Sequence, residues 1–152
     1  ARWSLFFDAL DLRPAYEPFT FHVGGHVYRP DFLLPSLGCF IETKPHGHEP
    51  DHGRYQPLVD WWQKLLVLLI GPPKRGEYEA SLYAPGWEAP ERGLVWGCGR
   101  RDHSEMWVCS IHTGFARCLN ERSSRLNWPT HSCHALREAS RLAMSYRFEE
   151  ER

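Results

Sequence analysis

The sequence predicts one α/β domain with the element order αβββαβ, in which helices flank a mixed β-sheet. Two observations predict this class. Apolar residues recur with helical spacing at about 2–11 and 58–65, and the segments between them are strand-like. A continuous apolar run at 65–70 then fits a buried strand. With 152 residues, 42% apolar and 24% charged, the chain suffices for one sizeable core. We expect a single domain over 1–152, with its core at about 2–71 and a C-terminal elaboration at about 72–148.

The core begins with one helix and three strands. The apolar stripe over 2–11 predicts the helix, which Arg13-Pro14 ends. Residues 16–22 and 26–34 predict two strands, and Gly24-Gly25 between them indicates a hairpin. Residues 38–44 predict a third strand, ended by a proline. These strands are short and closely spaced, so we expect a meander.

A second helix precedes the fourth strand. Leu58, Trp61, Trp62 and Leu65 form its apolar stripe, so both tryptophans are expected in the core, and Pro57 suits its first turn. Residues 65–70 give the buried strand.

The elaboration follows that strand. Residues 81–84, 93–98 and 106–111 predict an appended layer of short strands forming a β-hairpin. A last helix runs to Tyr146, with Thr130 or Ser132 as its N-cap.

Charge and cysteine usage limit the class of protein. The 18 Lys and Arg against 19 Asp and Glu give a net charge of −1, so the chain is not a general polycation. No apolar run reaches the ~18 residues of a membrane span, and no secretion signal opens the chain. The five cysteines include no CxxC pair, so we expect reduced thiols in the cytoplasm and no membrane partner. The chain opens inside the first predicted helix, so we also expect native residues before Ala1.

Three residues carry the chemistry. Asp31 lies near the end of one predicted strand. Glu42 and Lys44 lie two positions apart on the next strand, so the side chains of Glu42 and Lys44 point to the same face. If the strands pair, two carboxylates and an ammonium converge. Two carboxylates hold Mg²⁺ or Mn²⁺ through part of its shell, and the metal assists hydrolysis of a phosphodiester. The alternative is a surface ion pair of Glu42 with Lys44.

Pro30-Asp31 and Glu42-Thr43-Lys44, with their apolar flanks and the order αβββαβ, resemble the PD-(D/E)XK nuclease superfamily, whose fold is restriction-endonuclease-like. The resemblance covers about 2–71 and is nearest to small stand-alone nucleases of phages and bacteria. It implies that Asp31, Glu42 and the Thr43 backbone carbonyl bind metal and that Lys44 is catalytic. It further implies DNA as substrate, a bacterial or phage-infected cell as location, and, since many such nucleases pair to cut both strands, a candidate homodimer.

Further residues extend the candidate site. Many superfamily members carry another acid on the first helix, and here Glu17 is favoured over Asp8 as its stand-in. Some members also use a glutamine at the start of the next helix, where Gln56 lies. His46 and His48 in the loop after Lys44 are candidates for DNA contacts or a second metal, or belong to a solvated loop. Arg137 and Arg141, in a segment rich in arginine, are candidates for phosphate contacts or part of a solvated helix face.

Two other functions stay open. One is a non-catalytic nucleic-acid-binding module of a larger transposition or phage assembly. The other is an interaction protein stabilised by zinc, which needs four nitrogen or sulfur ligands. Its candidate ligands are Cys98, His103, Cys109, Cys118, His131, Cys133 and His134.

Overall fold

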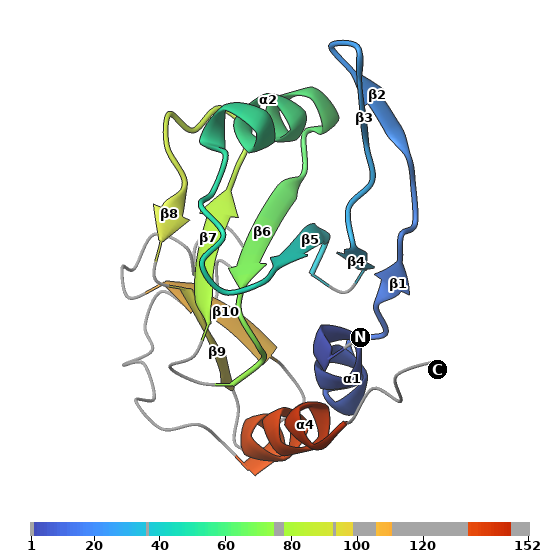
Figure 1. The fold of residues 1–152 in the computed structure, drawn as a ribbon, viewed down its shortest axis with the longest axis vertical. Helices are drawn as coiled ribbons and strands as arrows, with labels where there is room; N and C mark the ends of the chain where they lie inside the picture. The colour runs from blue at the N-terminus through green and yellow to red at the C-terminus, as the bar shows by residue number, and fades with distance from the viewer. Residues whose placement is uncertain are drawn as a thin grey trace.

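The chain folds into layers, with helices on both faces of a mixed sheet (Figure 1). The computed structural model describes residues 2–35, 37–74, 78–92, 94–98, 106–110 and 134–146, of which 91–92, 94–98, 106–110 and 134–136 are described by their backbone alone. The helices are α1 (Arg2–Ala9), α2 (His52–Trp62) and α4 (His134–Ser145). The strands are β1 (Ala15–Tyr16), β2 (Phe21–Val23), β3 (His26–Tyr28), β4 (Phe32–Leu34), β5 (Cys39–Lys44), β6 (Leu65–Ile70), β7 (Glu79–Tyr83), β8 (Glu91–Arg92), β9 (Leu94–Cys98) and β10 (Met106–Ser110).

The main sheet has six strands in the order β1-β4-β5-β6-β7-β8. Strands β5 and β6 are parallel, joined by the crossover helix α2, and the other pairs in this sheet are antiparallel. A parallel pair needs such a crossover connection. The antiparallel neighbours β1 and β4 are joined through the segment that holds β2 and β3. The predicted mixed sheet flanked by helices is therefore confirmed.

The first two predicted strands are each broken in two, which corrects the expected meander. Pro18 separates β1 from β2, and Pro30 separates β3 from β4. Proline has no N–H to donate to a ladder, so neither strand continues through it. Strands β1 and β4 stay in the main sheet, and β2 and β3 form a separate two-stranded hairpin that rises beside α2 (Figure 1).

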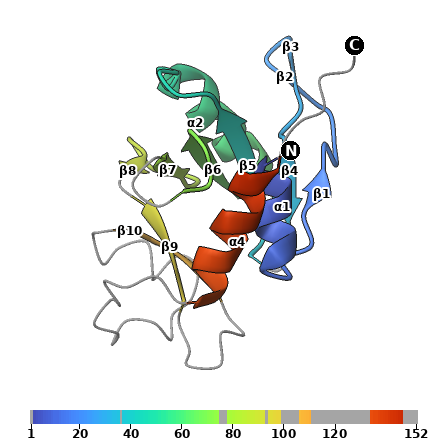
Figure 2. The same ribbon diagram turned by 60° about the horizontal axis from the view of Figure 1, so that its bottom comes forward.

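Each face of the sheet has its own apolar cluster. Helices α1 and α4 lie side by side under one face, where Phe7 and Ala143 are fully buried with Ile41 and Val67 (Figure 2). Trp3 in the same cluster donates its indole N–H to the Gly71 carbonyl at the end of β6, at 2.9 Å. On the other face, α2 packs on the even-numbered residues of β5 and β6. Among the described residues, no helix has both the length and the apolar character needed to cross a membrane.

Strand β7 belongs to the main sheet and not to an appended layer, which corrects the prediction for 81–84. It pairs with β6 from Leu66↔Tyr83 to Ile70↔Glu79. Ala80 and Leu82 enter one cluster and Tyr83 the other, so this strand is covered on both faces. The expected hairpin after it is present as β9 and β10, and β9 lies against β7 and α4.

Helix α2 starts earlier than its apolar stripe predicts. Asp51 is its N-cap, and its carboxylate accepts a hydrogen bond from the Arg54 N–H at 3.2 Å. Pro57 therefore lies inside the helix and not in its first turn. Trp61 is 56% exposed, so its expected place in the core is wrong, whereas Trp62 packs on Phe40. The expected N-cap of α4, Thr130 or Ser132, lies outside the described residues.

We expect Ala143→Leu to lower the free energy of unfolding by about 1–3 kcal/mol, because the larger side chain overpacks the contact of α4 with α1 and the sheet. Ala143 is fully buried. The matched control is Ser145→Leu, at an exposed position of the same helix, which should change the value by less than about 0.5 kcal/mol. Urea unfolding measures both, and equal effects would contradict the docking of α4.

We expect the buried Cys39 thiol to make the protein less stable at alkaline pH. Burial raises the pKa of Cys39 from an ordinary 9.0 to about 12. Above pH 9 the unfolded chain therefore releases a proton that the folded chain keeps, so stability is complete below about pH 9 and is lost as pH rises toward 12. The slope is about 1.4 kcal/mol per pH unit. Cys39→Ala should remove this contribution from the pH dependence of urea unfolding, and an unchanged slope would refute it.

Candidate active site

The register of β4 and β5 brings the predicted acids together. Phe32 pairs with Ile41 in an antiparallel ladder, so Asp31, one residue before β4, faces Glu42. Phe32 and Ile41 pack toward α1, and Glu42 therefore points to the opposite face of the sheet, toward α2. Lys44 follows on that face and forms an ion pair with Glu42. The expected pairing of these two strands is confirmed.

Asp31 is held by the backbone and side chain of Thr43. Its Oδ2 accepts hydrogen bonds from the Thr43 N–H and from the Thr43 hydroxyl, both at 2.7 Å. Two donors on one oxygen fix the carboxylate at the end of β5 and stabilise its charge. Asp31 thus bonds to β5 through its side chain, just beyond the last residue pair of the β4–β5 ladder.

Glu42 is a charged side chain inside the sheet, with 4% of its surface exposed. Burying an unpaired carboxylate costs several kcal/mol, so it needs partners. The Lys44 ammonium donates to its Oε1 at 2.5 Å, and the Tyr28 hydroxyl donates to its Oε2 at 2.7 Å. Both oxygens of the buried carboxylate are therefore bonded, one by a charge and one by a neutral donor.

Two tyrosines surround this carboxylate. Burial, then the negative charge of Glu42 and the hydrogen bond to it, raise the pKa of Tyr28 far above its ordinary value. Burial and the charge of Glu42 likewise raise the pKa of Tyr55 to about 12. Both hydroxyls keep their protons at any physiological pH, so Tyr28 stays a hydrogen-bond donor to Glu42.

The donor set fits a hard divalent cation. Asp31 and Glu42 supply carboxylate oxygens, which Mg²⁺ and Mn²⁺ prefer. The Thr43 N–H donates to Asp31, so Thr43 lies next to this aspartate. The resemblance implies the Thr43 backbone carbonyl as a further ligand. No cluster of three or more His, Cys, Asp or Glu side chains suited to a metal occurs within the described part of the chain. A cation held by Asp31 and Glu42 would take its other ligands from elsewhere, such as water.

The candidates for a third acid lie in different places. Glu17 lies beside Asp31, because its N–H donates to the Asp31 carbonyl at 2.9 Å, and its carboxylate pairs with Arg29 at 3.0 Å. Asp8 lies on α1, under the opposite face of the sheet, and accepts a hydrogen bond from Ser4. Glu17 is thus the acid near the site. Gln56 donates to the Ala84 carbonyl just past β7, at 2.9 Å.

The predicted nucleic-acid contacts fall on two sides of the molecule. His46 and His48 follow Lys44, His46 exposed and His48 half-buried. Arg137 and Arg141 are exposed on α4, which covers the face of the sheet opposite Glu42 and Lys44. Arg141 also binds Glu138 through two hydrogen bonds, at 3.0 and 2.5 Å. The structure does not bring these arginines to the acids.

The candidate zinc ligands lie outside the residues whose side chains are described. For Cys98, Cys109 and His134 the backbone alone is described. The others, His103, Cys118, His131 and Cys133, lie outside the described residues.

Tyr28 and Arg54 were not found from the sequence. Tyr28 joins the site from a separate hairpin, and nothing in its spacing indicates a bond to Glu42. Arg54 lies at the start of α2, with its guanidinium carbon 5.4 Å from the centre of the Tyr28 ring. Asp51 is a typical N-cap residue, and this signal predicts a helix start at 52 and not near Pro57. With that start, Arg54 lies on the helix.

Comparison with known proteins yields no relative. No protein-family model, curated protein or solved structure matches the chain.

Tyr28→Phe should lower the free energy of unfolding by about 1.5–3 kcal/mol, because it removes a hydrogen bond to a buried charge. The ring itself fills the same space in both proteins. Urea unfolding without divalent cations measures this effect. Tyr16→Phe, at a tyrosine that is 65% exposed, serves as the control and should change stability by less than about 0.5 kcal/mol. Equal values for the two variants would mean that the bond to Glu42 contributes nothing.

Proposed function

We propose that the protein is a nuclease dependent on Mg²⁺ or Mn²⁺ that hydrolyses phosphodiester bonds of DNA. One observation carries the proposal: the register of β4 and β5 places Asp31 opposite Glu42, and Lys44 forms an ion pair with Glu42. The alternative, a surface ion pair of Glu42 with Lys44, explains this arrangement less well. Such pairs are formed by two solvent-exposed side chains, whereas Glu42 is buried. The motif resemblance to PD-(D/E)XK nucleases supports the same conclusion.

Asp31, Glu42 and the Thr43 carbonyl would hold the cation, with Glu17 as a further candidate. When bound, the cation supplies positive charge against the negative charge of the phosphate being hydrolysed. Thr43 keeps Asp31 in place through two hydrogen bonds, and Tyr28 keeps Glu42 in place through one. The Lys44 ammonium orients the attacking water or neutralises charge that develops on the phosphate.

In the reaction, the water oxygen attacks phosphorus and one ester bond breaks. A proton from the water ends on the leaving alcohol, so hydrolysis needs no redox partner. By resemblance, the bond to the 3′ oxygen breaks and the products carry 5′-phosphates. The resemblance also supports a restriction-endonuclease-like topology, a cytoplasmic location in a bacterial or phage-infected cell and a homodimer.

The test is cleavage of supercoiled plasmid, linear duplex and single-stranded DNA with Mg²⁺ or Mn²⁺. We expect Asp31→Asn and Lys44→Ala each to lower the cleavage rate by about 100-fold or more. The first removes a charged ligand of the cation, and the second removes a positive charge beside the reacting phosphate. Asp11→Asn and Lys64→Ala are matched controls at exposed positions and should cleave like the wild type.

Urea unfolding of each variant separates loss of the site from loss of the fold. Equal cleavage by all five proteins would mean a contaminant or another site, and the proposal would be wrong. DNA binding without cleavage under either metal would favour the non-catalytic nucleic-acid-binding module. One zinc ion per chain that survives dialysis against EDTA would favour the zinc-stabilised interaction protein.

A further inference from the structure

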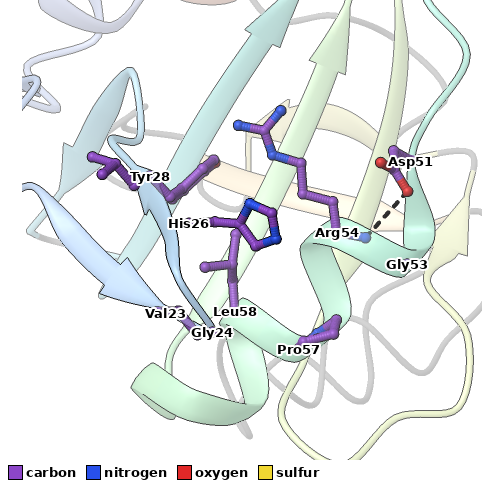
Figure 3. A pocket seen from close by; sticks show the side chains of 10 residues that line it. Val23, Gly24, His26, Tyr28, Asp51, Gly53, Arg54, Pro57 and Leu58 are labelled. Carbon is purple, nitrogen blue, oxygen red and sulfur yellow. Dashed lines mark hydrogen bonds between the residues drawn. The ribbon is translucent and has the colours of Figure 1, made fainter.

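A groove separates the β2–β3 hairpin from helix α2. It has a volume of 640 Å³, within the range of about 300–1,000 Å³ typical of ligand pockets. Figure 3 shows the side chains of His26, from the hairpin, and Arg54, from the helix, both projecting into this space. Val23, Pro57 and Leu58 give it apolar walls. The groove thus combines an apolar surface with a guanidinium and an imidazole.

One residue, Tyr28, belongs both to the groove and to the candidate active site. The Tyr28 ring lines the groove, and its hydroxyl donates to Glu42. The Arg54 guanidinium lies over the same ring. Asp51, which also lines the groove, accepts a hydrogen bond from the Arg54 backbone N–H. Among the described side chains, no carboxylate forms an ion pair with the Arg54 guanidinium, so its charge faces the groove.

Exposed aromatic rings lie on the same two elements that form the groove, α2 and the segment of β2. Arg54, Leu58 and Trp61 recur at helical spacing along α2 and share the side of the helix that meets the hairpin. The Trp61 ring, 56% exposed, lies 5.9 Å from the Phe21 ring of β2. Phe19, 53% exposed, lies 6.1 Å from Phe21. Two large rings are thus exposed on the elements that form a groove with a guanidinium.

We propose that this groove and the aromatic rings beyond it bind an unpaired DNA strand and deliver it to the carboxylates. An unpaired strand offers phosphates for Arg54 and His26 and bare base faces for Trp61 and the apolar walls. A duplex keeps its base faces stacked inside, so it offers the groove phosphates alone. The inference rests on the proposed nuclease function and names its substrate class: single strands, flaps and frayed ends.

Binding is tested in EDTA, where cleavage does not interfere. Fluorescence anisotropy compares the full chain on a labelled thymidine 10-mer and on a blunt duplex of equal length. We expect at least tenfold tighter binding of the single strand. Arg54→Ala should make the slope of log affinity against log salt shallower by about 0.7, the value for one lost phosphate contact on a single strand.

Trp61→Ala should weaken binding of the single strand by about 5- to 150-fold, the loss of one stacked base, with an unchanged salt slope. The matched controls are Arg13→Ala and Tyr146→Ala, which remove an exposed arginine and an exposed tyrosine elsewhere on the protein. Both should bind like the wild type. Preference for the duplex, or normal binding and salt slope in both groove variants, would overturn the inference.

The two proposals fail in different ways. If Arg54→Ala and Trp61→Ala weaken binding of the single strand but no protein cleaves DNA with Mg²⁺ or Mn²⁺, the groove assignment stands and the nuclease proposal falls. If cleavage depends on Asp31 and Lys44 while both groove variants bind single strands like the wild type, the nuclease stands and the groove assignment falls.

Discussion

The buried carboxylate of Glu42 is the constraint on which the rest of the site depends. A charge inside a central strand destabilises the sheet unless it is bonded, and here Lys44 and Tyr28 bond its two oxygens. One donor comes from the same strand and the other from a hairpin outside the main sheet. The carboxylate therefore links the hairpin to the sheet, and the ring contacts of Phe21 with Phe40 and Trp62 add to this link.

The two faces of the main sheet have different roles. Helices α1 and α4 cover one face with aromatic and small apolar residues, such as Phe7 and Ala143, and that face carries none of the three motif residues. The other face holds Glu42 and Lys44 next to the apolar cluster under α2. Changes at the α1–α4 contact should therefore affect stability before they affect the geometry of the acids.

Much of this arrangement could be predicted from local pattern, because Asp31, Glu42 and Lys44 lie in short segments whose alternation fixes their faces. The class of fold and the mixed sheet follow from the same signals, and so does the pairing of the second predicted strand with the third. Only the part Phe32–Leu34 makes that pairing, whereas His26–Tyr28 pairs with β2. Pattern did not predict the breaks at Pro18 and Pro30, since both prolines lie in otherwise strand-like runs. Nor did it predict Tyr28 or the exposure of Trp61, because both depend on where the separate hairpin packs against α2.

The two proline breaks have a wider consequence. Pro18 and Pro30 interrupt neighbouring strands between the main sheet and the hairpin, so β2 and β3 share no ladder hydrogen bonds with the sheet that carries the acids. Insertions or deletions at the hairpin tip around Gly24-Gly25 would leave the register of Asp31 and Glu42 unchanged. The tip of the hairpin can therefore vary in length, whereas Tyr28 at its base is fixed by the bond to Glu42.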